Sequence, residues 1–201
     1  MIGLLSPQHQ FPIPTLSDLQ KHNSAKIDDC ISFEKIKQQY GFLRDYQVPS
    51  VEISRIKDRY AFFWKKGIGK TVLGTILAKE KSQFGKVLIV VRKVTIRSPN
   101  GWLDHFKWIA PDLLYTDLCL NKSGKKEELI ARRNLIDVPV YFINHEKFRL
   151  YWDVICKGIS TIIIDESSLL RNHKSHLTRA FLKADQKYNF KNIYPLSGLP
   201  A

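Results

Sequence analysis

The sequence has no apolar run that approaches the length of a membrane span, and its first residues, MIGLLSPQHQFPIP, lack the basic start and the long apolar core of a secretory signal. Cysteine is scarce: Cys30, Cys119 and Cys156 lie far apart with no C-x-x-C spacing, which argues against a zinc site and against a disulfide framework. There is also no internal repeat and no low-complexity linker. We therefore expect a soluble protein of a reducing compartment, cytoplasmic or nuclear.

Acidic residues are the other shortage. The chain carries 19 Asp and Glu against 32 Lys and Arg, a formal net charge of +13 at pH 7. A single basic run such as Arg132-Arg133 is often only a solvated helix face, but an excess of this size over the whole chain indicates a polyanionic partner. Nucleic acid is the first interpretation, and an anionic membrane surface is the second.

The pattern that is present is globular, because 201 residues with 44% hydrophobic side chains can bury one sizeable core. Short runs that are apolar at every position indicate strands buried on both faces, and they cover residues 86–91, 138–144, 160–165 and 192–198. Amphipathic patterns that alternate with them predict helices over residues 71–81, 101–109, 125–136 and 174–187. This alternation predicts an α/β fold with a parallel, doubly wound sheet that has helices on both faces.

The first sixty residues have a different pattern. The segments PTLSDLQKH (14–22) and ISFEKIKQQYGF (31–42) predict two short helices, and Pro49 suits the first turn of a third helix that ends at Lys57. We expect a helical extension over residues 1–41, followed by the α/β domain over residues 42–201.

The segment FFWKKGIGKTVLG (62–74) follows the order strand, turn, helix that a phosphate-binding loop requires. Gly67 and Gly69 allow backbone N–H groups to face phosphate oxygens, Lys70 supplies a charge at the β- and γ-phosphates, and the Thr71 hydroxyl can join a Mg²⁺ shell. The general pattern also wants glycine where Trp64 stands. Taken alone, the segment is therefore either a nucleotide site or a basic turn.

A second motif, TIIIDES (161–167), places Asp165 and Glu166 directly after a buried strand. An ionised carboxylate in that position is unfavourable unless a cation pairs with it. We expect Asp165 to hold Mg²⁺ and Glu166 to polarise the water that attacks the γ-phosphate. The alternative is an acidic pair that only caps the segment after it.

In their order along residues 42–201, these motifs resemble the first RecA-like domain of superfamily-2 nucleic-acid helicases and translocases, near the Swi/Snf-like branch and the DEAD/DEAH-type helicases of bacteriophages. The matching segments are LRDYQ (43–47), KGIGKT (66–71), residues 87–108, YFINHEKF (141–148), IIIDESSLLRN (162–172) and LSGLPA (196–201). The resemblance implies a RecA-like P-loop NTPase fold and the cytoplasm of a bacterial or virus-infected host cell.

The resemblance also implies roles for single residues. ATP would be bound by Gln47, Gly67, Ile68, Gly69, Lys70 and Thr71, with Mg²⁺ on Thr71 and Asp165 and with Lys70 and Glu166 as the catalytic residues. DNA, with RNA not excluded, would be bound by Arg92, Lys93, Thr95, Arg97, Asn144, His145, Lys147 and Arg171. Ser197 and Gly198 would couple hydrolysis to movement.

The sequence departs from the family pattern in several places. Lys65 and Lys66 stand where an acidic residue and methionine are common, Leu199 replaces a threonine of the coupling motif, and Arg92-Lys93 replaces an Ala-Pro-like pair. The two extra lysines either tighten nucleotide or nucleic acid or point to solvent, and the lost hydroxyl at Leu199 bears on coupling and not on ATP binding.

The second RecA-like domain of the family, with its arginine finger, would follow Ala201. We expect a fragment or split product that needs that domain for hydrolysis and translocation, since an arginine finger is worth roughly 10³ to 10⁵ in rate. The alternative is a non-motor nucleic-acid-binding module or regulator. A metabolic P-loop kinase fits poorly, because no lid-like arginine cluster is evident.

Overall fold

Residues 54–201 form one unit around a six-stranded sheet in the order β1-β6-β5-β2-β4-β3. In this computed structural model, which describes residues 28–119 and 126–198 and side chains from residue 33 onward, every strand pairing is parallel. The strands are β1 (Phe62–Phe63), β2 (Lys86–Val91), β3 (Tyr115–Asp117), β4 (Val140–Asn144), β5 (Ile159–Asp165) and β6 (Asn192–Ser197). The predicted strands are confirmed, but β3 was missed because its three residues carry no apolar run.

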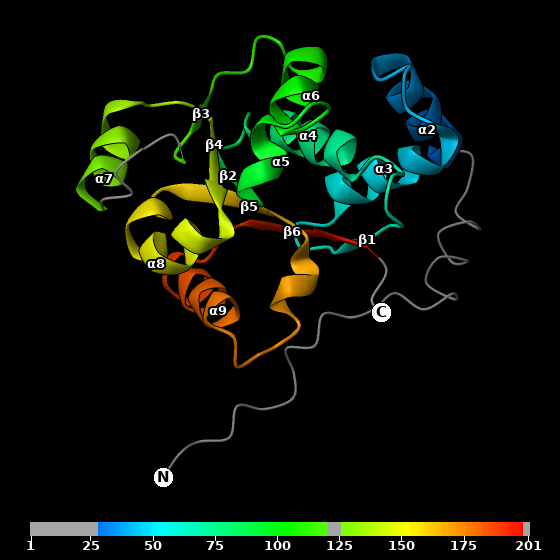
Figure 1. Ribbon diagram of the computed structural model, residues 1–201. Helices are drawn as coiled ribbons and strands as arrows, with labels where there is room; N and C mark the ends of the chain where they lie inside the picture. The colour runs from blue at the N-terminus through cyan, green and yellow to red at the C-terminus, as the bar shows by residue number, and fades with distance from the viewer. Residues whose placement is uncertain (1–27, 120–125, 199–201) are drawn as a thin grey trace. The chain divides into compact units, whose positions relative to one another are not determined.

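The chain crosses the sheet in one direction from β1 to β3 and returns from β4 to β6. Right-handed crossovers then place the helices of the two passages on opposite faces. Figure 1 shows α4 (Lys70–Lys81), α5 (Lys93–Arg97) and α6 (Trp102–Ile109) on one face, and α8 (His145–Ile155) and α9 (His176–Tyr188) on the other. The doubly wound α/β fold is confirmed.

Two helices were not predicted. Helix α5 is five residues long, too short for a periodic pattern, and α8 mixes aromatic and charged residues around a kink at Tyr151 (φ −129°, ψ 17°). The remaining elements of this unit are α7 (Lys126–Leu135) and the short 3-10 helix η3 (Ser167–Leu170). None of the helices in the described part of the chain is long and apolar enough to cross a membrane.

Residues 1–53 form the other unit. Its described elements are α2 (Asp28–Gln39), the 3-10 helix η2 (Asp45–Gln47) and most of α3 (Val48–Ile56). The predicted helix over 31–42 is confirmed in α2, and Pro49 does lie in the first turn of α3. The helix predicted over 14–22 lies outside the described residues, and the predicted boundary after residue 41 stays a prediction.

The core of the second unit lies around the central strands. Val87 to Val91 of β2, Val140 to Asn144 of β4 and Thr161 to Asp165 of β5 are all buried, because helices cover both faces of the sheet. Carboxyl ends of parallel strands all point to one edge of a sheet, so these strands bring the residues that follow them to the same edge.

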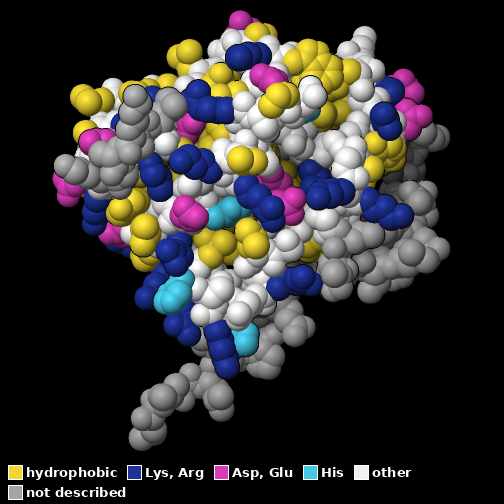
Figure 2. Space-filling model, in the orientation of Figure 1, with side chains coloured by type: hydrophobic (Ala, Val, Ile, Leu, Met, Phe, Trp, Pro, Cys, Tyr) yellow, Lys and Arg dark blue, Asp and Glu magenta, His cyan; other side chains and the backbone are white. Residues whose placement is uncertain are grey.

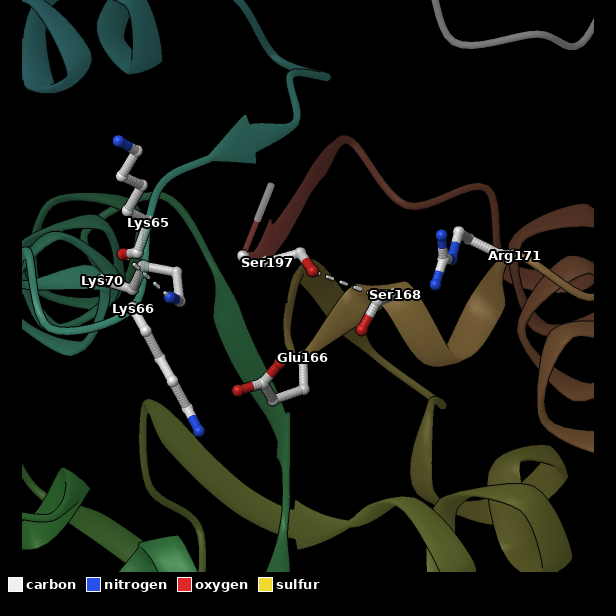
Figure 3. Close-up of a pocket in the computed structure, with 8 residues that line it drawn as sticks. Lys65, Lys66, Lys70, Glu166, Ser168, Arg171 and Ser197 are labelled. Carbon is white, nitrogen blue, oxygen red and sulfur yellow. Dashed lines mark hydrogen bonds between the residues drawn. The ribbon is translucent and has the colours of Figure 1, made fainter. Parts of the chain in front are cut away.

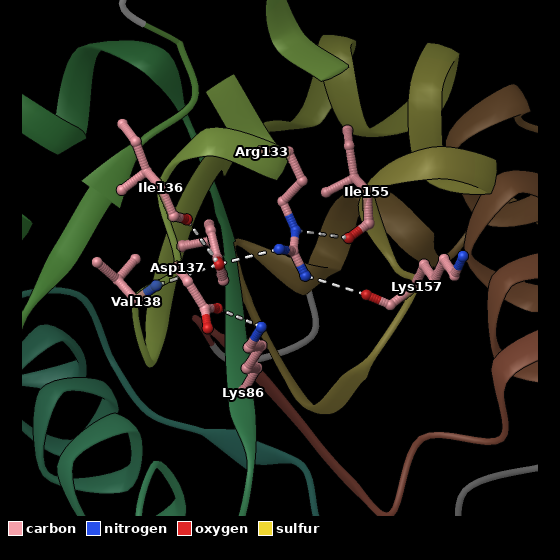
Figure 4. A network of polar contacts seen from close by, with 8 residues as sticks. Lys86, Arg133, Ile136, Asp137, Val138, Ile155 and Lys157 are labelled. Carbon is pink, nitrogen blue, oxygen red and sulfur yellow. Dashed lines mark hydrogen bonds and ion pairs between the residues drawn. The ribbon is translucent and has the colours of Figure 1, made fainter. Parts of the chain in front are cut away.

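A buried arginine connects α7 with the opposite, amino-terminal edge of the sheet. The Arg133 guanidinium lies 4.0 Å from the Tyr141 ring centre and donates to Tyr141 Oη (2.9 Å) and to the carbonyl oxygens of Ile155 (3.5 Å) and Lys157 (3.0 Å). Lys86 and Asp137 form an ion pair beside it (Figure 4). A buried guanidinium with this many acceptors stabilises the fold. Arg133 of the basic run Arg132-Arg133 therefore has a structural role.

Replacing Arg133 with alanine is expected to lower the free energy of unfolding by about 2 to 4 kcal/mol, because buried acceptors lose their donor and the Tyr141 ring loses its stacking partner. Urea denaturation measures the change. Arg132→Ala is the matched control, since Arg132 is half-buried and its Nε has no hydrogen-bond partner among the described residues. Equal losses for the two variants would contradict the structural role of Arg133.

Candidate functional site

The glycine-rich loop connects β1 to α4. Trp64 N donates to Ser197 O (2.9 Å), so the chain stays paired with β6 one residue beyond β1, and this position does not need a glycine. Gly67 (φ 84°) and Gly69 (φ 92°) then adopt left-handed conformations that other residues rarely reach. Gly69 is the N-cap of α4, so the loop ends at a helix N-terminus, where anions bind favourably.

The Lys70 side chain lies over this loop. Its Nζ donates to the backbone carbonyl oxygens of Trp64 (3.3 Å) and Lys65 (3.4 Å). Both distances are long for hydrogen bonds from an ammonium group, which forms shorter ones to charged oxygens. Phosphate oxygens are therefore better partners for Lys70 than the two carbonyl groups it contacts here.

The Asp165 carboxylate ends β5 and is only 8% exposed. It accepts hydrogen bonds from Trp102 Nε1 (3.1 Å) and from the Glu166 backbone N–H (3.0 Å). Burial raises the pKa of Asp165, and the hydrogen bond from Trp102 opposes that rise. A bound cation would relieve the same unfavourable burial of the ionised form.

Glu166 has a backbone conformation that is uncommon for its residue type. Its φ of 53° lies in the left-handed region, and the other non-glycine residues there in the described part of the chain are asparagines, which tolerate it. Strain of this kind concentrates at functional sites. Here the conformation ends β5 abruptly and leaves the Glu166 side chain on the wall of a pocket.

The pocket has a volume of about 410 Å³ and lies at the carboxyl ends of β1, β6 and β5, which are neighbours in the sheet. It is lined by Lys65, Lys66, Lys70, Glu166, Ser168, Arg171, Ser197 and Gly198. Figure 3 shows the Lys66 side chain extending toward the Glu166 side of the pocket and the Lys65 side chain pointing away. With four cations and one carboxylate, the lining favours a polyanion.

Ser197, which was predicted as a coupling residue, contacts the segment after Asp165 and Glu166. Its Oγ accepts a hydrogen bond from Ser168 N (3.2 Å), which joins the end of β6 to the start of η3 (Figure 3). Gly198 lines the same pocket, and Leu199 lies outside the described residues. A movement of the end of β6 would therefore also move the start of η3, and the reverse.

The donor set fits Mg²⁺ carried by a triphosphate. The described residues hold no group of three or more His, Cys, Asp and Glu side chains that could cage a metal. Mg²⁺ commonly uses one or two carboxylates together with substrate phosphates and water. Asp165 and Thr71, which is half-buried in the first turn of α4, are residues of the right chemistry for that arrangement.

The cations predicted to bind nucleic acid lie at the same edge, over the neighbouring strands β2 and β4. Arg92 and Lys93 follow β2 and are exposed. His145 follows β4; burial is the main cause that lowers the pKa of its imidazole, and the charge of the nearby Arg92 lowers it further. Arg97 is also exposed and pairs with Asp117 (3.0 Å). This edge of the sheet thus holds the glycine-rich loop on one side and a cationic surface on the other.

Other predicted nucleic-acid residues have partners within the fold. Asn144 is buried, and its side chain caps α8 by accepting from Lys147 N (2.9 Å). The Lys147 ammonium donates to Leu118 O (3.4 Å), and the Thr95 hydroxyl donates to Arg92 O (2.9 Å). These hydrogen bonds position the loops of this edge, and whether the side chains also contact nucleic acid stays a prediction.

Three further predicted residues lie elsewhere. Arg171 lines the same pocket as Lys70, whereas Arg92 and His145 do not line it. Ile68 is half-buried in the loop. Gln47 belongs to the other unit, where it is buried and accepts from Arg44 N (2.9 Å), and its contact with adenine stays a prediction.

His145 connects the two sides of the edge. With hydrogen on Nε2, its ring donates to the Asp165 carbonyl oxygen (2.9 Å). Burial lowers the pKa of His145, so the neutral ring is favoured. A residue predicted to contact nucleic acid therefore touches the backbone of the predicted metal ligand.

Trp102 is the residue that sequence reasoning missed. Its side chain is fully buried, as in a core residue, and its indole N–H donates to Asp165. Gly74 of α4 makes room for it, since a Cβ at Gly74 would lie 2.4 Å from Trp102 Cη2. A glycine inside a strong helical pattern was the one signal of this close approach in the sequence.

Trp102→Phe is expected to weaken Mg²⁺-dependent nucleotide binding roughly tenfold, because Asp165 loses a hydrogen bond to its charged form. The pKa of Asp165 then rises further, so the defect is larger at pH 6 than at pH 8. Titrations with a fluorescent ATP analogue at both pH values test this. Trp108→Phe, at an exposed position of the same helix, is the control and should change nothing.

No family model matches the sequence, and no curated protein sequence matches it. Solved structures share its fold. The Sulfolobus solfataricus SWI2/SNF2 ATPase core in complex with dsDNA aligns with a TM-score of 0.59 and 17% identity, over 79% of this chain and 32% of that one. T4 UvsW aligns with a TM-score of 0.58 and 16% identity, over 76% and 29%, and another structure of the UvsW helicase from bacteriophage T4 with 0.50 and 16%, over 76% and 51%. The chain thus spans about a third to a half of these proteins, and the likeness confirms the predicted RecA-like α/β fold.

Proposed function

We propose that this chain is the ATP- and nucleic-acid-binding first RecA-like domain of an ATP-dependent DNA helicase or translocase. The observation that carries the proposal is the pocket at the ends of β1, β6 and β5, where Lys70 and Glu166 come together beside a buried Asp165. Lys70 and the acidic pair were predicted from separate motifs, more than ninety positions apart in the chain. Chance basic turns and simple acidic caps do not account for that convergence.

In this proposal the loop holds the triphosphate. Backbone N–H groups from Gly67 to Thr71 and the Lys70 ammonium bind its oxygens, and Thr71 and Asp165 are the residues for Mg²⁺. The metal would neutralise charge that develops on the phosphates during transfer. A bound cation would favour the ionised form of Asp165 in spite of its burial.

Glu166 is the proposed general base. Its position on the pocket wall, after the abrupt end of β5, suits a carboxylate that orients water toward a terminal phosphate. In this proposal an arginine finger comes from a second RecA-like domain and contributes roughly 10³ to 10⁵ in rate, so residues 1–201 by themselves hydrolyse ATP slowly.

DNA is the proposed partner of the cationic side of the edge, through exposed residues such as Arg92 and Lys93. Contacts of this type go mainly to phosphates and carry little sequence information. The hydrogen bonds His145 to Asp165 and Ser168 to Ser197 are proposed to connect DNA binding with the nucleotide site.

The test is ATP hydrolysis with and without DNA, for the chain alone and with a RecA-like second half from a related helicase supplied in trans or by fusion. We expect weak turnover alone and DNA-stimulated turnover with the second half. DNA binding with no turnover in either case would favour a non-motor module, and absence of nucleotide binding would overturn the proposal.

A further inference from the structure

Helices α8 and α9 leave a groove between them. It is separate from the pocket that Lys70 and Glu166 line and from the cationic surface of Arg92 and Lys93. The groove has a volume of about 440 Å³, and its lining includes Arg149, Leu150 and Trp152 of α8 and His176, Arg179 and Lys183 of α9. Among the described residues, none lines both this groove and the nucleotide pocket. In Figure 2, Lys, Arg and His side chains gather over the lower part of the molecule, where Figure 1 places these helices.

The basic residues of α9 form a row along one side of the helix. His176, Arg179, Lys183 and Lys187 recur at spacings of three and four residues, which places them on one face. At 1.5 Å per residue the row is about 16 Å long. Arg149 of α8 adds a further charge across the groove.

This charge is not compensated within the described part of the fold. The described groove lining contains no carboxylate, and Asp185, the acidic residue of α9, pairs with Arg59 (2.9 Å) instead. Asp153 of α8 lies 3.9 Å from Lys126. Within residues 33–119 and 126–198, no ion pair reaches Arg149, Arg179 or Lys183. An ordinary solvated helix face has both signs of charge interspersed, so this one indicates a polyanionic ligand.

The geometry favours a nucleic-acid backbone over an acidic protein segment. A linear row of cations matches a ligand whose charge repeats regularly, and one strand of a duplex carries a phosphate every 3.4 Å, about five along this row. The Trp152 ring, the natural anchor for a protein partner, is half-buried and already faces Lys187 Nζ at 5.9 Å and Tyr188 at 6.5 Å.

The row is also continuous with the cationic edge. Helix α8 begins at His145, and α9 begins five residues after Arg171, so both helices start at the carboxyl edge of the sheet and run away from it. DNA bound at the edge can therefore extend along the groove. We infer that the α8–α9 groove is a second DNA-backbone site, an inference that rests on the proposed function for its choice of ligand.

The experiment compares two triple variants of the whole chain. The groove variant, Arg149→Ala/Arg179→Ala/Lys183→Ala, loses three charges that line the groove. The control variant, Lys107→Ala/Lys157→Ala/Lys191→Ala, loses three exposed charges elsewhere, so the two variants have equal net charge. Binding of a duplex of mixed sequence, about three helical turns long at 10 to 10.5 base pairs per turn, is measured from about 50 to 200 mM salt. ATP affinity and thermal melting serve as checks on the fold.

The groove variant is expected to bind DNA at least tenfold more weakly and to lower the slope of log affinity against log salt by about 2 to 3, at about 0.9 for each phosphate that is no longer neutralised. The control variant should keep the wild-type slope. If the two variants have the same DNA affinity and the same salt slope, the groove is not a DNA-backbone site, and the proposed function is unaffected. Failure of the wild-type chain to bind the duplex at the lowest salt overturns both the groove and the proposed DNA partner, whereas ATP affinity reports separately on the nucleotide site.

Discussion

Lys70→Ala is expected to lower the affinity of the chain for Mg²⁺–ATP by about 10- to 100-fold. A hydrogen bond to a charged group is worth about 1.5 to 3 kcal/mol, and each 1.4 kcal/mol is roughly a factor of ten. In the described structure the ammonium donates to two backbone carbonyl oxygens of its own loop at long distances, so its removal should change the fold little, although it takes away a charge that lowers the pKa of the buried Asp165. Titration with a fluorescent ATP analogue measures the loss.

Lys191→Ala is the matched control for charge. Lys191 is exposed and precedes β6, at the end of that strand opposite the pocket. The control should bind ATP as the wild type does. If Lys70→Ala also binds ATP with wild-type affinity, the loop is only a basic turn and the proposal that it binds nucleotide is wrong.

Glu166→Gln is expected to reduce single-turnover hydrolysis by roughly 10² to 10⁴ while leaving ATP affinity within a few-fold, because a general base acts in the transition state. Glutamine keeps the size of the side chain, and its backbone meets the same φ of 53° as glutamate. The assay uses the chain together with its supplied second half, so that the rate is high enough to measure.

Glu146→Gln controls for the loss of one negative charge near the edge, since Glu146 is exposed in the first turn of α8. It should hydrolyse ATP at the wild-type rate. A Glu166→Gln variant that hydrolyses ATP normally would remove Glu166 from the chemistry and leave the pocket as a binding site alone.

The sheet was predictable because its strands are apolar at every position, which is a local property. The runs at 86–91 and 160–165 became β2 and β5 almost residue for residue. The order of the strands in the sheet could not be predicted in this way, since it depends on which strands, distant in the sequence, pair with each other. It is this order that places β6 between β1 and β5, and so brings Ser197 into the pocket.

The residues of the candidate site were predictable where a motif carries them and not where packing does. Lys70, Asp165 and Glu166 belong to short motifs whose chemistry is local. Trp102 lies 63 positions before Asp165, and nothing in the sequence around it shows that its indole reaches that carboxylate. The pocket position of Arg171, predicted only as a nucleic-acid residue, likewise depends on how η3 folds back after β5.

Lys65 and Lys66, the unusual residues of the loop, also separate once the fold is known. Both line the pocket, but only Lys66 extends toward the side where Glu166 lies (Figure 3). Whether either lysine tightens nucleotide or nucleic-acid binding, or only points to solvent, stays a prediction.

A crystal structure of the chain with Mg²⁺ and a non-hydrolysable ATP analogue would decide whether the loop and the acidic pair form one nucleotide site. We expect the triphosphate on the backbone N–H groups of residues 67–71, the metal between Thr71 and Asp165, and Lys70 Nζ moved from the carbonyl oxygens of Trp64 and Lys65 to phosphate oxygens. An analogue bound at another surface, with Lys70 still on those carbonyl groups, would contradict the proposed site.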